Sequence, residues 1–381
     1  MRLVRVGIIG LGLMGIRYAK YFKEGKVEGA ILSAVVTSRK ERMDWVKETF
    51  TNKVDIYSNL DDLITSGNVD ALIIATPHYH HPAAAIQAFH AGYHVLIEKP
   101  AGVYTKQVRE MNEAAANSGK VFSIMYNQRT NPLYIKLRDL IESGELGEIY
   151  RTNWIVTNWY RTQSYYDAVS WRASWATDGG GVLMNQSPHQ LDLWQWTTGM
   201  MPKRIRAFCH FGKYHNIEVE DDVTVYVEYE NGATGVFITS TGEAPGTNRY
   251  ELSGTLGKIV IEDNKLSFWR LREPIHEFNE RYKDGGFKKP ECWECEVPTQ
   301  GEIKDGHLEV ILDWIDTIRN GTPLLSPGEE GMKGLTLANA MLLSTWTDNW
   351  VELPMDEDLF YEYLIQKIQS SDRSDRHGKT H

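Results

Sequence analysis

The first 125 residues alternate short apolar runs of strand length with amphipathic segments of helix length. The apolar runs are Leu3–Ile9, Ile31–Val36, Ala71–Ala75, His94–Ile97 and Val121–Met125. The segments expected to be helical are Gly12–Phe22, Lys40–Phe50, Pro82–Ala91 and Thr105–Ser118. Thr105 can cap the last of these helices, and Gly119 follows it as a helix-ending residue. Near-continuous apolar strands separated by amphipathic helices predict a parallel sheet covered on both faces.

From about residue 127 the pattern changes to that of a mostly antiparallel sheet. A helix is expected over Pro132–Glu142 and two more near the C-terminus, at His307–Arg319 and Gly328–Asn349. The strand-like runs between them are Ile149–Asn158, Ile205–Gly212, Asp222–Tyr229, Thr234–Thr241, Arg249–Ser253, Lys258–Ile261 and Leu266–Arg270. Asn231-Gly232 separates two of these runs and predicts a hairpin turn.

These patterns predict an α/β protein with two domains and a tail. We expect a parallel α/β domain over residues 1–126 and an α+β domain with a large open, mostly antiparallel sheet over residues 127–365. The polar residues 366–381 are expected to form a flexible tail. A length of 381 residues suits this division, since a domain typically takes roughly 100–200 residues.

Composition narrows the class of protein and its partners. The chain is 42% hydrophobic and 24% charged, as is usual for a globular protein. Its net charge of −10 argues against nucleic acid or an anionic membrane surface as a partner. Arg2 and Arg5 precede an apolar run, as in a signal peptide, but Arg17, Lys20 and Lys23 follow it on a helical repeat. We therefore expect a cytoplasmic protein without a membrane-spanning segment.

The cysteines suggest neither disulfides nor a metal. Three cysteines are too few for a disulfide framework in a chain of this size. Cys292 and Cys295 form a CxxC pair that Cys209 and His210 could complete as a zinc site, but no second paired ligand motif is present. We expect two reduced thiols in a loop and no metal.

A glycine-rich turn follows the first predicted strand. Gly10, Gly12 and Gly15 form a GxGxxG pattern between a strand and a helix. In that position the glycines permit a tight turn, close approach to a pyrophosphate and close packing of helix on strand. The helix N-terminus then offers free N–H groups to the phosphates. We therefore expect a Rossmann dinucleotide-binding domain, with Leu13 and Met14 in the same turn.

The end of the second strand bears on the choice between NAD and NADP. An acidic residue there would hold the ribose 2′-hydroxyl of NAD. The chain instead has Thr37, Ser38, Arg39 and Lys40, whose hydroxyls and cations suit a 2′-phosphate. The alternative is that Arg39 and Lys40 simply begin a solvated helix. We expect an NAD(P) cofactor with a slight preference for NADP.

Three later motifs occur in the order Thr76-Pro77-x-x-His80, Glu98-Lys99-Pro100 and Gly179-Gly180-Gly181 followed by His189 and Asp192. With the glycine-rich turn, they make the chain resemble the Gfo/Idh/MocA oxidoreductases, the family of glucose–fructose oxidoreductase and inositol dehydrogenase. The resemblance covers nearly the whole chain. It implies a homodimer or homotetramer formed through the C-terminal sheet. The residues expected at the cofactor are Gly10, Gly12, Leu13, Met14, Gly15, Ser38, Arg39, Thr76, Pro77, His80, Glu98, Lys99 and Asn127.

The resemblance also implies catalytic roles for Lys99 and His189. Lys99 is expected at a strand end, where ligands bind in open α/β sheets. Ser187-Pro188-His189-Gln190 reads as a capping box, which would place a neutral His189 in a first helical turn, suited to act as a general base. Alternatively a helix from Gly181 is kinked at Pro188, and Asn185 and His189 share one face. Many family members carry an acid where this chain has Asn185, so Asn185 is expected to orient a hydroxyl without accepting its proton.

Residues 150–196 are rich in aromatic side chains, of which at least half are expected in the core. The loop-like segment Asn158–Ser174 combines rings with polar groups that suit a sugar or polyol. Its candidate substrate-binding residues, beside Lys99, Asn185 and His189, are Arg161, Tyr165 and Trp171. Arg161 or Arg172 could pair with an acidic sugar or with a neighbouring subunit.

We therefore expect an NAD(P)-dependent enzyme that transfers hydride between nicotinamide and a secondary alcohol or ketone of a sugar or polyol. Two alternatives stay open. One is a glycosidase that oxidises its substrate transiently and retains NAD, and the other is a regulator that binds a dinucleotide without turnover. The presence of both Lys99 and His189 argues against the regulator.

Overall fold

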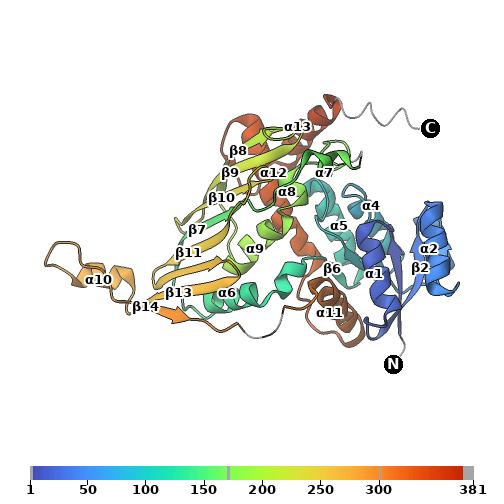
Figure 1. Ribbon diagram of the computed structural model, residues 1–381, viewed down its shortest axis with the longest axis horizontal. Helices are drawn as coiled ribbons and strands as arrows, with labels where there is room; N and C mark the ends of the chain where they lie inside the picture. The colour runs from blue at the N-terminus through green and yellow to red at the C-terminus, as the bar shows by residue number, and fades with distance from the viewer. Residues whose placement is uncertain (1–2, 170–171, 300, 302, 372–381) are drawn as a thin grey trace. The chain divides into compact units, whose positions relative to one another are not determined.

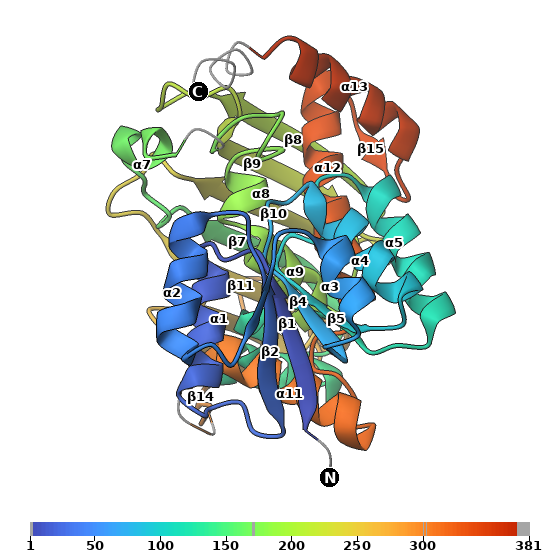
Figure 2. The ribbon, with the colours of Figure 1, turned by 90° about the vertical axis from the view of Figure 1, so that its right-hand side faces the viewer.

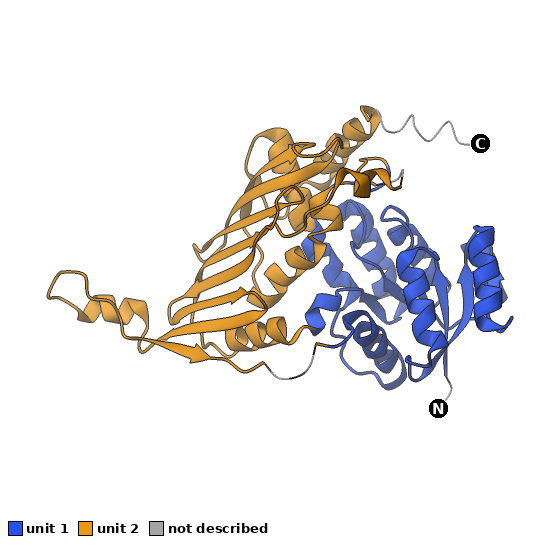
Figure 3. Ribbon diagram, viewed as in Figure 1, with its two compact units in different colours: residues 1–130, 177–179, 304–335 blue, residues 131–176, 180–303, 336–381 orange. Residues whose placement is uncertain are grey.

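The computed structural model describes residues 3–169, 172–299, 301 and 303–371. Their contacts divide the chain into two compact units, coloured separately in Figure 3. Unit 1 comprises residues 1–130, 177–179 and 304–335, and unit 2 comprises 131–176, 180–303 and 336–381. The predicted boundary at residues 126 and 127 is close to the first crossing between the units, but two later segments return to unit 1.

Unit 1 contains, among its described residues, a six-stranded parallel sheet in the order β3-β2-β1-β4-β5-β6. Its strands are β1 (Val4–Ile9), β2 (Ala30–Val36), β3 (Asp55–Tyr57), β4 (Ala71–Ile74), β5 (His94–Ile97) and β6 (Phe122–Ile124). The central strands are apolar because both faces are covered, and every residue of β4 is buried. The strand order reverses between β1 and β4, and the carboxyl ends of these strands border the crevice where such sheets bind ligands.

The helices of the sheet lie on both of its faces. They are α1 (Leu13–Lys23), α2 (Lys40–Phe50), α3 (Leu60–Ser66), α4 (His80–His90) and α5 (Thr105–Ser118). Figure 2 shows α1 and α2 on one side of the sheet and α4 and α5 on the other. The prediction of a capping Thr105 was wrong, because Thr105 is the first residue of α5 and Tyr104 occupies the cap position without a side-chain capping bond. Gly119 ends α5 in the left-handed conformation, as expected.

A helix from the C-terminal third of the chain completes the core of unit 1. Asp305 caps α11 (Gly306–Asn320) by accepting a hydrogen bond from the His307 N–H. Trp314 and Val310 on this helix are fully buried and pack in one cluster with Val6 and other apolar residues of the sheet. The sequence analysis predicted this helix but assigned it to the second domain.

Unit 2 is built on a nine-stranded sheet of described residues, in the order β14-β13-β12-β11-β7-β10-β9-β8-β15. The strands are β7 (Ile149–Val156), β8 (Arg204–Phe211), β9 (Glu220–Glu228), β10 (Thr234–Ser240), β11 (Asn248–Gly254), β12 (Gly257–Glu262), β13 (Lys265–Leu271), β14 (Cys292–Glu296) and β15 (Val351–Glu352). The sheet is mostly antiparallel, as predicted, and β7 pairs with β10 in parallel. The Asn231-Gly232 turn joins β9 to β10, and Gly232 has a φ of +82°.

The expected loop around the CxxC pair is a strand. Cys292 and Cys295 lie three residues apart in β14, so their side chains point to opposite faces. This alternation separates the two thiols and removes the reason to treat them as one site. Among the described residues, no group of His, Cys, Asp or Glu side chains has an arrangement that could hold a metal ion.

Helices cover one face of this sheet (Figure 1). They include α6 (Pro132–Glu142), α8 (Val182–Asn185) and α9 (Pro188–Thr198). Further helices of the unit are α7 (Gln163–Asp167), α10 (Ile275–Arg281) and α13 (Glu357–Gln369), and α12 (Gly331–Thr347) begins in unit 1 and continues into unit 2. Short 3₁₀ turns lie at Asn127–Thr130 and Gly328–Glu330. The expected tail from residue 366 was placed too early, because α13 extends to Gln369, and residues 372–381 lie outside the described part.

The core of unit 2 is aromatic. Trp154 stacks on Tyr250 at 4.1 Å between ring centroids, and Trp194 stacks on Phe237 at 5.3 Å. Of the nine described aromatic residues in 150–196, five are buried, which agrees with the expectation of at least half; they are Trp154, Tyr166, Trp175, Trp194 and Trp196. No helix among the described residues is both long and apolar enough to cross a membrane.

Candidate active site

The turn between β1 and α1 shows why each glycine of GxGxxG is present. Gly10 has a φ of +90°, and a Cβ there would lie 2.6 Å from the Ala75 carbonyl oxygen at the end of β4. A Cβ on Gly15 would lie 2.0 Å from the Gly10 carbonyl oxygen. A Cβ on Gly12 would instead meet no described atom within 4 Å. Two glycines therefore permit close packing, and the third leaves open space before the helix N-terminus.

Other features of this edge fit a dinucleotide. The first turn of α1, which is fully described, contains no acidic residue that would repel a phosphate. Thr76 follows β4 and Asn127 follows β6, and in each a buried side-chain oxygen has no hydrogen-bond partner among the described residues. Buried polar atoms in native proteins are nearly always satisfied, so these oxygens suit a bound polar ligand. Leu13 is 86% exposed in the same turn, and Pro77 and His80 are also exposed.

The end of β2 presents its polar side chains to solvent. Ser38, Arg39 and Lys40 are exposed, whereas Thr37 is buried. Arg39 is the residue before α2, and within the described part of the chain its guanidinium has no carboxylate within ion-pair distance. The position therefore offers a cation that no described acidic side chain neutralises.

Lys99 lies in a polar cluster at the end of β5. Its backbone N–H donates to Glu98 Oε2 at 3.1 Å, and the buried Tyr18 hydroxyl donates to the same carboxylate. Burial lowers the pKa of Lys99, although the carboxylates of Glu98 and Asp178 act in the opposite direction. Burial also raises the pKa of Glu98. Burial therefore makes Lys99 a better proton donor than a solvated lysine, although the carboxylates of the cluster oppose this effect.

Asp178 and His78 are residues of this cluster that the sequence analysis missed. His78 Nδ1 lies 2.9 Å from the Asp178 carbonyl oxygen, and both residues belong to unit 1. Asp178 is 1% exposed and directly precedes the glycine run Gly179–Gly181. Its position directly before the glycine run is the sequence signal that could have identified it.

His81, also missed, connects two loops. Its ring lies between the Pro100 carbonyl oxygen, 2.8 Å from Nδ1, and the Thr76 carbonyl oxygen, 2.7 Å from Nε2. The ring is fully buried, and burial lowers the pKa of His81 to about 4, so at neutral pH it holds one proton and donates to one carbonyl at a time. The loop after β4 and the loop carrying Lys99 are thereby held together. The neighbouring His80, which the sequence predicts at the cofactor, is exposed.

The first turn of α11 brings His307 to the same edge. His307 Nδ1 lies 3.4 Å from Asn127 Nδ2, and a Cβ on Gly306 would lie 2.6 Å from the Asn127 carbonyl oxygen. Burial lowers the pKa of His307 to about 4, and the charge of Lys99 contributes to this shift. The end of β6, the start of α11 and Lys99 thus lie close together within unit 1.

In unit 2, Asn185 and His189 occupy a distinctive pair of positions. Among residues 181–198, all of which the structure describes, they alone are not fully buried. Helix α8 ends at Asn185 and α9 begins at Pro188, so the stretch is two helices broken at residues 186 and 187. An amide and an imidazole are therefore the partly accessible side chains of this broken helical stretch.

The predicted capping box is wrong. Ser187 makes no side-chain capping bond; its hydroxyl instead lies 2.8 Å from the Thr239 hydroxyl. The start of α8 is satisfied by the buried Glu220, whose Oε1 accepts hydrogen bonds from the N–H groups of Gly181 at 2.8 Å and Leu183 at 3.0 Å. A Cβ on Gly181 would lie 1.9 Å from the Glu220 carbonyl oxygen, which explains the glycine.

The predicted substrate-binding residues of the loop meet at Tyr165. The guanidinium carbons of Arg172 and Arg161 lie 3.9 Å and 5.1 Å from the centroid of its ring. Gln186 Nε2 lies 3.4 Å from the Tyr165 hydroxyl and 3.4 Å from Asn185 Oδ1. The structure therefore brings Arg161, Tyr165 and Asn185 together, and Trp171 lies outside the described residues.

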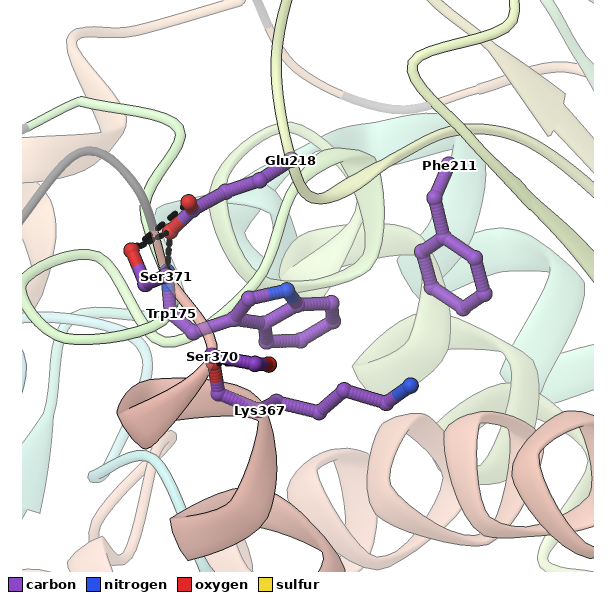
Figure 4. A pocket seen from close by; sticks show the side chains of 6 residues that line it. All are labelled: Trp175, Phe211, Glu218, Lys367, Ser370 and Ser371. Atoms are coloured by element: carbon purple, nitrogen blue, oxygen red, sulfur yellow. Dashed lines mark hydrogen bonds between the residues drawn. The ribbon is translucent and has the colours of Figure 1, made fainter.

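Unit 2 also has a separate cavity of about 230 Å³ (Figure 4). Trp175, Phe211 and Lys367 line it, and Glu218 on its wall accepts hydrogen bonds from the Trp175 N–H at 2.7 Å and from the Ser371 hydroxyl. None of the residues lining it is among those predicted for cofactor, substrate or catalysis. The predicted residues thus gather at two other places, the strand ends of unit 1 and the Tyr165–His189 region of unit 2.

Comparison with known proteins identifies the family. The model of the oxidoreductase family with an NAD-binding Rossmann fold matches residues 4–126, and the model of the GFO/IDH/MocA C-terminal domain matches residues 134–260. Together these matches span more than half of the 381 residues. The chain belongs to the Gfo/Idh/MocA family of oxidoreductases.

Similar proteins include enzymes that act on sugars and polyols. Myo-inositol 2-dehydrogenase of Thermotoga maritima is 24% identical over 344 residues, covering 88% of this chain and 95% of the relative. The scyllo-inositol 2-dehydrogenase (NADP(+)) IolW of Bacillus subtilis is 25% identical over 358 residues, covering 90% and 94%. The crystal structure of the WlbA dehydrogenase from Bordetella pertussis, in complex with NADH and UDP-GlcNAcA, is similar with a TM-score of 0.78 at 26% identity, covering 93% and 100%.

The buried histidines of unit 1 predict a loss of stability in acid. Burial lowers the pKa of His78, His81, His94 and His307 to about 4, from 6.5 in an unfolded chain. The unfolded state therefore binds more protons, and stability is full above about pH 6.5 and falls as the pH drops towards about 4. Glu98 and Asp313, whose pKa values are raised, titrate in the opposite sense but are two groups against the four histidines. The urea midpoint of unit 1 should decrease steadily across this window.

The control for this measurement is His90→Gln, a change at an exposed position of α4 that should leave the pH dependence as it is. His94→Gln should reduce the slope, because it removes one of the buried rings. A midpoint that stays constant between about pH 6.5 and about pH 4 would contradict the assignment of neutral buried histidines.

Proposed function

We propose that this protein is an NAD(P)-dependent dehydrogenase or reductase that acts on a secondary alcohol or ketone of a sugar, polyol or sugar derivative. The observation that carries the proposal is Lys99, a lysine of lowered pKa at the end of β5, on the same sheet edge as the open Gly12 turn. Similar proteins that are named as inositol dehydrogenases support this class of substrate.

The proposed roles follow from the chemistry of each side chain. A bound nicotinamide supplies the hydride acceptor or donor. Lys99 donates a hydrogen bond to the oxygen of the reacting carbon as negative charge develops there. His189 removes the hydroxyl proton as a general base, and in reduction it returns that proton. Asn185 orients the same or a neighbouring hydroxyl through its amide and does not itself take the proton.

We further propose a slight preference for NADP. The uncompensated cation of Arg39 and the exposed Ser38 hydroxyl suit a 2′-phosphate, which guanidinium groups bind in a bidentate fork. The relatives include both types of cofactor in their names, since IolW is NADP(+)-dependent by name and WlbA was crystallised with NADH.

Self-association through the nine-stranded sheet is the last part of the proposal. One face of β8 is buried through Ile205, Ala207 and Cys209. Its opposite face carries Phe208, which is 51% exposed, and the neighbouring β9 carries Tyr226, which is 38% exposed. Exposed apolar side chains grouped on one face are typical of an interface between subunits. We propose a homodimer or homotetramer.

A substrate panel tests the function. The protein should reduce NAD or NADP with at least one sugar or polyol, followed by the absorbance of the reduced nicotinamide. Lys99→Ala should lose most turnover while still binding cofactor, and His189→Ala should lose about 10²–10⁴-fold in rate. Lys20→Ala and His90→Ala, at exposed positions of α1 and α4, are the matched controls.

Three outcomes would contradict these roles. Near-normal turnover of Lys99→Ala would remove Lys99 from the mechanism, and a loss below about threefold in His189→Ala would assign the base to another group. Release of free sugar from a glycoside in the same panel, with tightly retained NAD and no net reduction, would assign the chain to the transiently oxidising glycosidases.

The 2′-phosphate contact predicts a selective effect at Arg39. Loss of one charge-assisted hydrogen bond costs roughly 1.5–3 kcal/mol, or about 10- to 150-fold in affinity. Arg39→Ala should weaken NADP binding by that factor and leave NAD nearly unchanged, whereas Lys47→Ala at the other end of α2 should change neither. The measurement is the dissociation constant of each cofactor for the wild type and the variants. A wild-type preference for NAD of about tenfold or more would refute the 2′-phosphate contact.

Light scattering tests the proposed assembly. The wild type should have the mass of a dimer or tetramer, and Phe208→Asp with Tyr226→Asp should reduce it to a monomer, because a charge buried without a partner opposes association. The control is Tyr361→Asp on α13, also at an exposed aromatic position, which should leave the mass of the assembly unchanged. A monomeric wild type would exclude the interface.

A further inference from the structure

Two arginines of unit 2 lie against a single aromatic ring. Arg172 and Arg161 approach Tyr165 at 3.9 Å and 5.1 Å from guanidinium carbon to ring centroid. Arg161 donates hydrogen bonds to the carbonyl oxygens of Trp159 at 3.3 Å and Tyr160 at 2.9 Å. Within the part of the chain that the structure describes, no carboxylate lies within ion-pair distance of Arg161. Positive charge is thus concentrated here in a chain whose net charge is −10.

Two acidic side chains of unit 2, Asp221 and Asp167, make their hydrogen bonds to groups other than the Arg161 guanidinium. Asp221 is fully buried and accepts hydrogen bonds from the N–H groups of Lys213 at 2.9 Å, Tyr214 at 2.8 Å and His215 at 3.1 Å. Asp167 accepts a hydrogen bond from Gln163 at 3.1 Å. These contacts pair both carboxylates with groups other than the Arg161 guanidinium.

The same buried acid fixes the position of Arg161. The ring of His215 lies between Asp221 Oδ2, 3.0 Å from Nδ1, and the Arg161 carbonyl oxygen, 2.9 Å from Nε2. The Arg161 N–H also donates to the Thr241 carbonyl oxygen at 2.9 Å. The backbone of Arg161 is therefore anchored on both sides, which orders a guanidinium before any ligand binds.

This positive region is continuous with the candidate catalytic residues of unit 2. Gln186 connects the Tyr165 hydroxyl to the Asn185 amide, at 3.4 Å on each side. The accessible residues of the stretch 181–198, all of it described, are Asn185 and His189, and neither is a carboxylate. A ligand at Asn185 would therefore find two cations, a phenol hydroxyl, an amide and an imidazole in this part of unit 2.

We propose that Arg161 and Arg172 bind the anionic group of the substrate, which is a sugar derivative carrying a carboxylate or a phosphate. The proposal rests on the proposed function, because it specifies the substrate of the same site. Guanidinium groups match both anions in a bidentate fork. Tyr165 holds the two guanidinium groups by stacking, and Nη1 of each also donates to backbone carbonyl oxygens of the same loop. The neutral Asn185 avoids the repulsion that an acid would exert on such a substrate.

Equilibrium binding tests the proposal independently of hydride transfer. The probes are D-glucuronate for the carboxylate, D-glucose 6-phosphate for the phosphate and D-glucose as the neutral reference, each titrated by calorimetry. At least one anion should bind about 10- to 150-fold more tightly than D-glucose, as one or two charge-assisted hydrogen bonds would give. The anion that binds identifies carboxylate or phosphate as the recognised group.

Variants connect that preference to the two arginines. Arg161→Gln and Arg172→Gln should each bring the ratio of anion to glucose affinity towards one. Lys136→Gln, which removes an exposed cation of α6 that pairs with Asp139, should leave the ratio unchanged. Circular dichroism of each variant verifies that the fold is retained, and Arg161→Lys, which keeps the charge without the fork, should recover part of the preference.

The outcomes separate this inference from the proposed function. Equal affinities for the three probes, no measurable binding of either anion, or an anion preference that survives both glutamine variants would overturn the anionic subsite. Reduction of nicotinamide with neutral polyols would then leave the proposed function in place and would indicate that Arg161 pairs with an acid of a neighbouring subunit. An anion preference without any hydride transfer would retain the subsite and overturn the proposed function.

Discussion

The nucleotide-binding edge of unit 1 depends on how closely two backbone segments approach each other where the strand order reverses. The Gly10 turn lies so near the end of β4 that any side chain on Gly10 would overlap the Ala75 carbonyl, and Gly15 must lie directly on the Gly10 carbonyl. This contact fixes the direction of α1 relative to the sheet. Because β4 continues into Thr76 and β5 into Lys99, the same contact sets where the remaining polar residues of the edge are found.

Buried polar groups provide the second level of organisation. His81 joins the loops after β4 and β5 through their carbonyl oxygens, and Glu220 satisfies the first N–H groups of α8. Asp221 does the same for the turn at residues 213–215. A buried donor or acceptor that loses its partner costs about 1–3 kcal/mol, so these contacts favour one arrangement of the loops over others. The partly buried residues Asn185 and Lys99 therefore lie on loops that these contacts hold in place.

Local signals explain what could be predicted from the sequence. GxGxxG between a strand and a helix specifies its own conformation, because the requirement for a missing Cβ is local, and Asn231-Gly232 specifies its turn for the same reason. Apolar runs identified β1, β2, β4, β5 and β6, but β3 has only three residues and no alternation that would distinguish it. His80 and His81 are neighbours with the same side chain, and only tertiary burial distinguishes them. The pairing of Ser187 with Thr239 across 52 positions likewise overrode a capping pattern that was locally reasonable.

The return of α11 to unit 1 has a consequence for synthesis of the chain on the ribosome. The Rossmann sheet is complete in sequence by residue 124, yet Val310, Ile311, Trp314 and Ile315 are needed to cover the apolar side that carries Val6 and Tyr18. The nascent N-terminal segment therefore waits, with that surface uncovered, while nearly two hundred further residues are made. At translation rates of roughly 5–20 residues per second, this interval lasts on the order of ten seconds or more. During this interval the unfinished core exposes apolar surface that chaperones can bind. A gene fragment that ends after β6 would encode a domain whose core stays incomplete.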